Sequence, residues 1–142
     1  MSTLDAGRRM AGIDVIPVGV VESSLTDLAD APKQGHEGAP DAWLVFDATV
    51  GDALTGIRTG ARLIVLTWLD RARRDVLRCH PRDDVTIPMQ GVFNTRSSER
   101  PNPIGLHEVE VLAVEGLRVH VRPLEAVDGT PILDVKPVLR RG

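Results

Sequence analysis

Aromatic residues are the scarcest class in this sequence, which has no tyrosine, two tryptophans and two phenylalanines. The core must therefore be built from valine, leucine, isoleucine and alanine. A hydrophobic content of 42% supports a packed globule, and 142 residues suit one domain with one core. RNA recognition usually relies on aromatic stacking and basic surface, whereas this chain has few aromatics and a net charge of −3. Composition alone therefore does not indicate a nucleic-acid-binding protein.

Cysteine is almost absent as well. Because Cys79 is the single cysteine, it has no partner for an internal disulfide, which fits a reducing compartment. The N-terminus shows no basic region followed by a long apolar run, and no apolar stretch reaches the length of a membrane span. We expect a soluble, cytoplasmic protein with no signal peptide and no membrane partner.

The first part of the chain predicts one strand and one long loop. Residues 1–12 are polar and contain glycine, so we expect a flexible lead-in to a single domain over residues 13–139. Residues 13–22 are β-branched and apolar, and they predict a strand with a bulge or a sheet edge at Pro17. Residues 23–40 are polar and rich in proline and glycine, which is typical of a surface loop.

The middle of the chain predicts two strands and two helical pieces. Residues 42–46 predict a strand, and residues 62–69 are a near-continuous apolar run that predicts a strand buried on both faces. Residues 52–57 predict one helical turn, and residues 70–77 predict a short helix capped by Asp70.

Five arginines and four aspartates lie between residues 70 and 84, so their charges nearly cancel. Such a cluster is typical of a solvated face, and an RNA contact is the alternative interpretation. Residues 85–88 predict a short strand after it.

A hairpin is predicted from residues 106–114 and 117–121, which both alternate between apolar and polar side chains. A two-residue turn at Glu115-Gly116 would place Val111 opposite His120 and His107 opposite Leu124. The two histidines are then not facing partners. His36 and His80 have no ligand spacing around them, so we expect no metal site.

The last part of the chain predicts a turn at Asp128-Gly129 and a final strand after Pro131. Asp134 and Lys136 would share one face of that strand. Many short strands with glycine and proline turns and little helix predict an all-β fold, either a small antiparallel barrel or a curled open sheet.

The segment from Gly91 to Leu106, GVFNTRSSERPNPIGL, separates two predicted strands. Pro101 and Pro103 fix their own φ angles and bias the preceding residues toward extended backbone. A long, stiff loop that presents Arg96 and Arg100 is a good platform for an anionic or carbonyl-bearing ligand. The alternative is a rigid connection whose arginines pair with local acidic residues.

Three segments together resemble one family. Residues 91–105 and residues 128–137, DGTPILDVKP, are similar to two long motifs of the TsaA-like proteins, the tRNA N6-methyltransferase O family. Pro32-Lys33-Gln34 is similar to a Pro-Arg-Gln in the N-terminal loop of that family. The motifs agree in order and spacing, and the resemblance runs roughly from Val18 to Val138.

The resemblance implies a small β-barrel that binds S-adenosyl-L-methionine without a Rossmann fold and forms a homodimer. It also implies methylation of N6 of threonylcarbamoyl-adenosine in tRNA. The sequence agrees with a non-Rossmann site, because no G-x-G-x-x-G follows a predicted strand. The cofactor contacts implied by the resemblance are Pro32, Lys33, Gln34, Arg96, Leu106, Asp128, Gly129, Thr130 and Pro131.

The chemistry of the cofactor suggests roles for these residues. Arg96 or Lys33 suits its carboxylate, and Asp128 or Asp134 suits a cationic group. Methyl transfer is an in-line displacement, so catalysis would rest mainly on positioning. Asp134 is the candidate base, with Lys136 and Arg100 as further candidate catalytic residues.

The sequence departs from the family pattern at two places. Ala61-Arg62 stands where members commonly carry Ser-His, and Val138 replaces an aromatic residue after Lys136-Pro137. These changes affect the acceptor more than the cofactor. Two alternatives to a tRNA methyltransferase follow: a methyltransferase of the same fold that acts on a small molecule, and a non-catalytic module that binds S-adenosyl-L-methionine.

Overall fold

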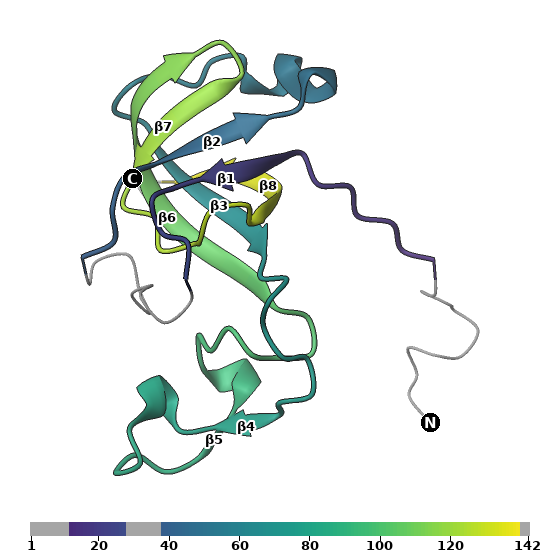
Figure 1. Cartoon of the computed structure of the whole chain (residues 1–142), viewed down its shortest axis with the longest axis vertical. Coiled ribbons are helices and arrows are strands. Elements are labelled where there is room, and N and C mark those ends of the chain that lie inside the picture. Colours follow the sequence, from purple (N-terminus) through teal and green to yellow (C-terminus); the bar gives the residue numbers. More distant parts are fainter. Residues whose placement is uncertain (1–11, 28–37, 140–142) are drawn as a thin grey trace.

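The computed structural model describes residues 12–27 and 38–139, and six strands in these ranges close into an antiparallel barrel (Figure 1). In neighbour order the strands are β1 (Gly19–Glu22), β2 (Ala42–Phe46), β7 (Arg118–Arg122), β6 (Ile104–Glu115), β3 (Arg62–Trp68) and β8 (Pro131–Pro137), and β8 pairs again with β1. The prediction of an all-β fold with an antiparallel barrel is confirmed.

The barrel interior is filled by aliphatic side chains, as the shortage of aromatics predicts. Alternate residues of each strand point inward because successive side chains of a strand face opposite sides. The fully enclosed aliphatic side chains include Val21, Leu44, Val65, Val109, Val111, Val119, Val121, Leu124 and Ile132. Phe46 is the one aromatic side chain in this cluster.

The prediction that residues 62–69 are buried on both faces was wrong. β3 buries Leu63, Val65 and Thr67, whereas Ile64 and Leu66 on its other face are half-buried. A barrel has a single interior, so a strand can bury only one of its faces there.

The β6–β7 hairpin forms as predicted, but in a different register. The turn lies at Gly116 and Leu117, and Gly116 takes a φ of 62°. His120 therefore pairs with Ala113 instead of Val111, and a bulge separates this part of the ladder from the next. His107 pairs with Val65 on β3 rather than with Leu124, which lies beyond the end of β7. The turn starts one residue later than predicted because the glycine occupies its first position.

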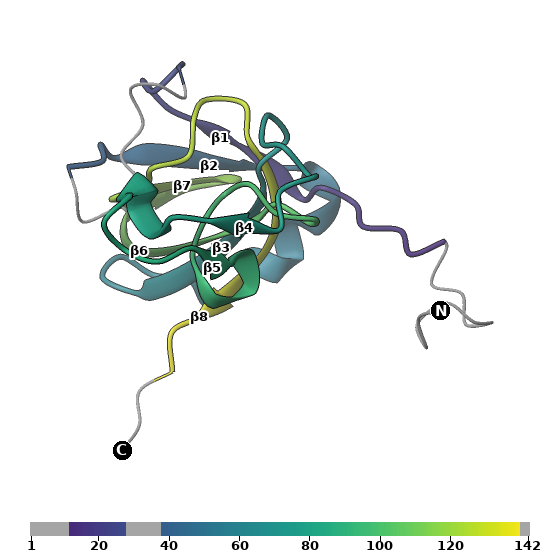
Figure 2. The ribbon, with the colours of Figure 1, turned by 90° about the horizontal axis from the view of Figure 1, so that it is seen from below.

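Residues 70–103 form a separate projection from one end of the barrel, which we call the lobe (Figure 1). It contains the two-stranded sheet of β4 (Arg78–Cys79) and β5 (Gln90–Gly91) and the 3-10 helices η5 (Pro81–Asp83) and η6 (Val92–Asn94). Seen from the side of the lobe, the barrel strands surround the position of β4 and β5 (Figure 2). The lobe therefore stands beyond the open end of the barrel.

Two elements predicted within the lobe do not form. Residues 70–77 are irregular instead of helical, because the Arg74 guanidinium donates to Pro101 O and Asn102 Oδ1 and holds this segment against the long loop. Residues 85–88 are not a strand, since the Asp84 carboxylate accepts from the N–H and hydroxyl of Thr86 and forms a turn there. A helix of eight residues has little stability of its own, so tertiary contacts decide its fate.

The boundaries of two further elements differ from the predictions. The predicted helical turn at residues 52–57 is instead the end of the 3-10 helix η4 (Ala48–Leu54), which Asp47 caps by accepting from Thr49 N. The predicted strand over residues 13–22 is shorter, because only β1 is paired in the barrel. Residues 13–17 form an exposed extended arm (Figure 1). Most of the predicted lead-in lies outside the described residues.

Candidate functional site

Four strand ends meet at the end of the barrel that faces the lobe, which we call the lobe-side end. β3 finishes and β6 begins at the pair Trp68–Ile104. β8 begins beside the end of β3 and beside β1, at the pair Val20–Pro131. Loops that are far apart in the sequence therefore converge here, and they include most of the predicted cofactor residues.

The Asp128-Gly129 turn forms as predicted, and backbone contacts hold it at this end. Asp128 N donates to Leu25 O over 2.6 Å, and one Asp128 carboxylate oxygen accepts from Ser23 N over 3.0 Å. Gly129 takes a φ of 85°, which favours glycine. Thr130 is buried, and its hydroxyl donates to Val127 O over 2.7 Å. The turn is thus a rigid feature, and the second Asp128 oxygen has no hydrogen bond to another described residue.

Arg100 fixes the conformation of the long loop of residues 91–103. The Arg100 guanidinium donates to three carbonyl oxygens of the same loop, those of Val92, Thr95 and Ser97. These bonds organise the loop, and the predicted catalytic role of Arg100 stays a prediction. A guanidinium with these partners has little hydrogen-bonding capacity left for a substrate.

Arg96 lies on the same loop but differs from Arg100 in its exposure and in its hydrogen bonding. It is exposed, and it makes no hydrogen bond or ion pair with another described residue. The loop that carries it is stiff, because Thr95 Oγ1 donates to Val92 O and accepts from Ser97 N. Arg96 is therefore an exposed cation that can bind a ligand carboxylate without losing a partner among the described residues.

The other predicted residues lie on the outer wall of the barrel. Leu66 on β3 pairs with Leu106 on one side and with Asp134 on the other, so the three side chains stand in a row across β6, β3 and β8. Asp134 forms an ion pair with Lys136 over 3.2 Å, and both side chains are more than half exposed. The predicted common face of Asp134 and Lys136 is confirmed. An exposed pair of this kind contributes about 0–1 kcal/mol to stability.

Pro32, Lys33 and Gln34 lie outside the described residues, so their predicted contact with the cofactor stays a prediction. The described segment before them ends at Asp27 and is tied to the lobe, because Arg71 Nη1 donates to Thr26 O over 3.3 Å.

A buried chain of polar side chains lies just inside the lobe-side end, and sequence reasoning missed it. His107 Nδ1 is 2.5 Å from Glu125 Oε1, and His107 Nε2 is 2.7 Å from Thr67 Oγ1. Hydroxyl, imidazole and carboxylate stand in the order of a hydrolase triad, but Thr67 is fully buried, so no substrate can reach its hydroxyl. The signal that could have revealed the chain is the alternation of β6, which sends residue 107 inward with Val109 and Val111.

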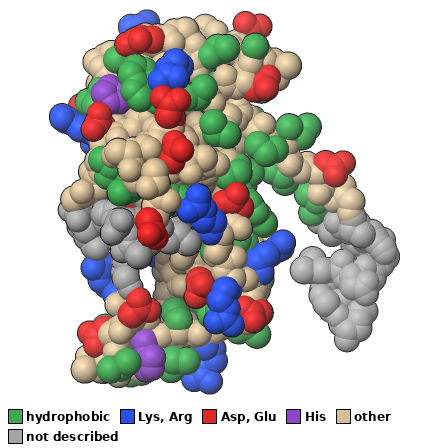
Figure 3. All heavy atoms as spheres, in the orientation of Figure 1, with side chains coloured by type: hydrophobic (Ala, Val, Ile, Leu, Met, Phe, Trp, Pro, Cys, Tyr) green, Lys and Arg blue, Asp and Glu red, His purple; other side chains and the backbone are tan. Residues whose placement is uncertain are grey.

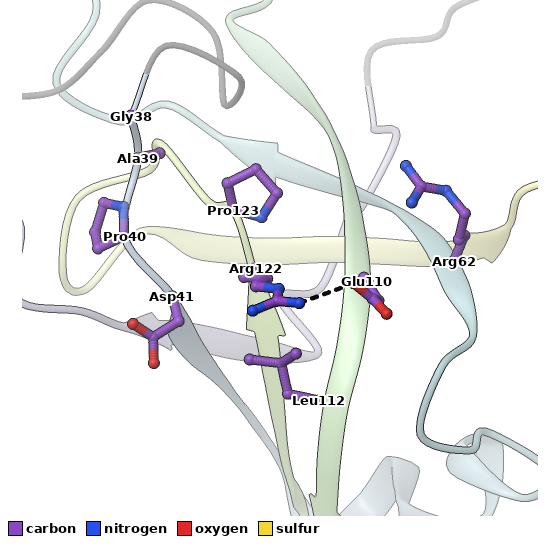
Figure 4. Close-up of a pocket in the computed structure, with 9 residues that line it drawn as sticks. All are labelled: Gly38, Ala39, Pro40, Asp41, Arg62, Glu110, Leu112, Arg122 and Pro123. Carbon is purple, nitrogen blue, oxygen red and sulfur yellow. Dashed lines mark ion pairs between the residues drawn. The ribbon is translucent and has the colours of Figure 1, made fainter.

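A hollow of about 740 Å³ on the barrel wall is a separate feature (Figure 4). It lies between the segment before β2, the end of β7 and the outer faces of β6 and β3. The hollow is lined by Gly38, Ala39, Pro40, Asp41, Arg62, Glu110, Leu112, Arg122 and Pro123. None of the predicted site residues that the structure describes lines it. It does contain Arg62, one of the two departures from the family pattern.

The charges around this hollow are balanced. Arg62 pairs with Glu108 over 2.8 Å, and Arg122 lies 3.6 Å from Glu110. A hydrogen bond from His120, which also stacks on Trp43, holds the pKa of Asp41 below its ordinary value. The hollow thus has no unpaired cation to attract an anion.

No group of three or more histidine, cysteine or acidic side chains in the described part of the chain could hold a metal ion. No described helix is long and apolar enough to cross a membrane.

A closed six-stranded barrel with its candidate ligand residues on loops at one end defines a class of small β-barrel proteins without a Rossmann-type site. Residues 20–141 match the family model described as the tRNA-methyltransferase O N-terminal domain, and the chain belongs to this family.

Relatives in two archaea share much of the sequence. An S-adenosyl-L-methionine-binding protein of Archaeoglobus fulgidus is 46% identical over 121 residues, which cover 84% of this chain and 85% of the relative. A probable S-adenosyl-L-methionine-binding protein of Methanothermobacter thermautotrophicus is 41% identical over 125 residues, which cover 88% of this chain and 89% of the relative.

A solved structure shares the fold. The crystal structure of TrmO from Pseudomonas aeruginosa superposes with a TM-score of 0.72 at 25% identity, over 92% of this chain and 58% of that chain. The chain thus spans a little more than half the length of the solved protein it matches.

Proposed function

We propose that this chain binds S-adenosyl-L-methionine at the lobe-side end of the barrel and transfers its methyl group to a nitrogen atom. The observation that carries the proposal is the convergence of the family's two long motifs, one on the lobe loop and one at the Asp128 turn, on this end. The names of the archaeal relatives support the choice of cofactor.

The donor set at this end fits the cofactor. Arg96, which has no ion pair with another described residue, supplies a cation for the carboxylate, and an oxygen of Asp128 accepts from a cationic or hydroxyl group. Leu106, which is partly exposed on β6, offers an apolar surface. The bound cofactor supplies an electrophilic methyl group on a sulfonium, and the protein's task is to orient it toward the acceptor.

We propose N6 of threonylcarbamoyl-adenosine in tRNA as the acceptor, in agreement with the name of the family model. The lobe supports contact with RNA. It carries seven arginines and five acidic residues, whereas the rest of the chain has ten basic and fifteen acidic residues. Asp134 stays the proposed proton acceptor.

Deleting the gene should remove the methylated threonylcarbamoyl-adenosine from digested tRNA, and the unmethylated nucleoside should rise in its place. Mass spectrometry of nucleosides from the deletion strain and its parent measures this, with a plasmid copy of the gene as the control for restoration. A normal nucleoside profile would contradict the tRNA assignment. Turnover of the cofactor on a small molecule would then favour the metabolite methyltransferase, and binding without any turnover the non-catalytic module.

We also propose a homodimer that covers the lobe. A two-stranded sheet is marginally stable by itself, and the lobe has one fully buried aliphatic side chain near it, Val92. The large exposed hydrophobic side chains of the lobe are Leu77, Val85, Ile87, Met89 and Phe93, and Figure 3 shows hydrophobic side chains among the charged ones on its surface. A patch of exposed apolar side chains on one part of a surface is typical of an interface.

Replacing Val85 and Phe93 together by serine should weaken the dimer at least about tenfold, because each substitution acts twice in a symmetric interface. Sedimentation velocity at several concentrations measures the dissociation constant. Leu139→Ser is the matched control, since this side chain is 82% exposed but lies outside the lobe. The assignment of the interface would be contradicted if Leu139→Ser raised the dissociation constant as much as the double variant does. An unchanged dissociation constant in the double variant would contradict it as well.

A further inference from the structure

We propose that Thr67, His107 and Glu125 form a buried positioning chain that holds the Asp128–Pro131 turn against β6 and thereby sets the shape of the cofactor pocket. The inference rests on the proposed function, because it concerns the same pocket. It assigns a role to three residues that belong to none of the family motifs discussed above.

The first support is the completeness of the hydrogen bonding in a place where polar groups are costly. Thr67 and His107 are buried, and the side chain of Glu125 is 14% exposed. If the ring carries one hydrogen, on Nδ1, it donates to the Glu125 carboxylate and accepts from the Thr67 hydroxyl at Nε2. Every buried side-chain polar atom in the described residues has a partner. Removing one member would leave another buried and unpaired.

The second support is the space reserved for the chain at Gly105. Gly105 stands opposite Thr67 in the β3–β6 ladder. A Cβ at this position would lie 2.4 Å from Thr67 Oγ1 and 2.6 Å from His107 Nε2. The absence of a side chain at residue 105 is therefore what allows the hydroxyl and the imidazole to meet.

The third support is the position of the chain between two walls of the proposed pocket. His107 directly follows Leu106 on β6. Glu125 comes three residues before Asp128, and the intervening Ala126 and Val127 are buried, which makes the link short and stiff. A displacement of Glu125 is therefore transmitted to the turn.

The chain also ends where β3 changes its register with β8. The register shifts between Leu66 and Thr67, so that Thr67 pairs with Ile132 and Leu66 with Asp134. The hydroxyl at the end of the buried chain thus ties β3 to β6 at a position beside the start of β8. His107 acts through its neighbours and is a positioning residue rather than a catalytic one.

The test compares cofactor affinity with stability in matched variants. Thr67→Val keeps the shape of the side chain and removes the hydroxyl, and it should raise the dissociation constant of S-adenosyl-L-methionine at least about tenfold by calorimetry. Thr67→Ser keeps the hydroxyl and should stay within about twofold of the wild type. Val119→Ala, a cavity substitution on β7 away from this end, should lower the melting temperature without weakening cofactor binding.

Each outcome separates the two proposals. A wild-type chain that does not bind the cofactor would overturn both the proposed function and this inference. Wild-type binding with unchanged affinity in Thr67→Val, or equal weakening in Val119→Ala, would overturn the inference alone. If Thr67→Val does not fold, the wild-type chain with ¹⁵N-labelled histidine decides the question. The Nδ1 and Nε2 signals of His107 should shift when S-adenosyl-L-methionine is added, and signals that do not move would overturn the inference.

Discussion

Gly105→Ala should destabilise the protein by about 3 kcal/mol and lower its melting temperature by about 10 °C. The new Cβ would lie 2.4 Å from Thr67 Oγ1 and 2.6 Å from His107 Nε2, where no real contact is possible. Either the hydroxyl and the imidazole separate, or β6 moves away from β3. Both responses break a buried hydrogen bond. Thermal unfolding followed by circular dichroism measures the shift.

Gly91→Ala is the matched control for this prediction. Gly91 has a φ of −62°, which suits alanine, and the nearest neighbour of its Cβ would be Leu77 O at 4.0 Å. Its melting temperature should change by no more than about 2 °C. If Gly105→Ala melted like this control, the contact between Thr67 and His107 would not be what residue 105 protects.

Arg96→Ala should weaken the binding of S-adenosyl-L-methionine at least about a hundredfold, because a charge-assisted pair with the cofactor carboxylate is lost. The loss should appear without loss of stability, since Arg96 is exposed and contacts no other described residue through a hydrogen bond or an ion pair. Arg96→Lys keeps the charge but loses the planar guanidinium, and its affinity for the cofactor should fall between those of the wild type and Arg96→Ala. Calorimetric titration with the cofactor measures all three proteins.

Arg78→Ala is the control for Arg96→Ala. Arg78 is an exposed arginine of the same lobe, on β4, and it lies outside the family motifs. Its substitution changes the charge of the lobe by the same amount and should leave the affinity within about twofold of the wild type. Equal losses in the two variants would point to the general charge of the lobe, and unchanged affinity in Arg96→Ala would remove Arg96 from the site.

The strands that could be predicted from the sequence are those marked by a short apolar run or by alternating side chains between turn residues. β2, β3, β6, β7 and β8 appear within a few residues of their predicted positions, because these signals act locally. Other segments were predicted less well. The segment of residues 70–77 is shaped by the partners of Arg74 in a loop about thirty residues away, and no local preference contains that information.

The candidate site likewise has features that the sequence predicts and features that only the structure shows. The Arg96 loop and the Asp128 turn are visible in the sequence as stiff, unusual segments. The separate roles of Arg96 and Arg100 are not, because both are arginines in one loop and only the folded backbone brings three carbonyl oxygens to Arg100. His107 was assessed in the sequence for a histidine partner, and its actual partners come from β3 and from the loop after β7.

By itself, the sequence determined the fold class, the aliphatic core, the turn at Asp128 and the family, because each depends on residue types and spacings along the chain. Closure of the barrel decided which residues of the candidate site contact one another. It brought Thr67, His107 and Glu125 into contact, gave Gly105 its function and left Arg96 without a hydrogen bond or ion pair to another described residue. The physical reason is that pairing across strands and burial of polar groups depend on distances in space, and residues 40 positions apart become neighbours only when the barrel closes.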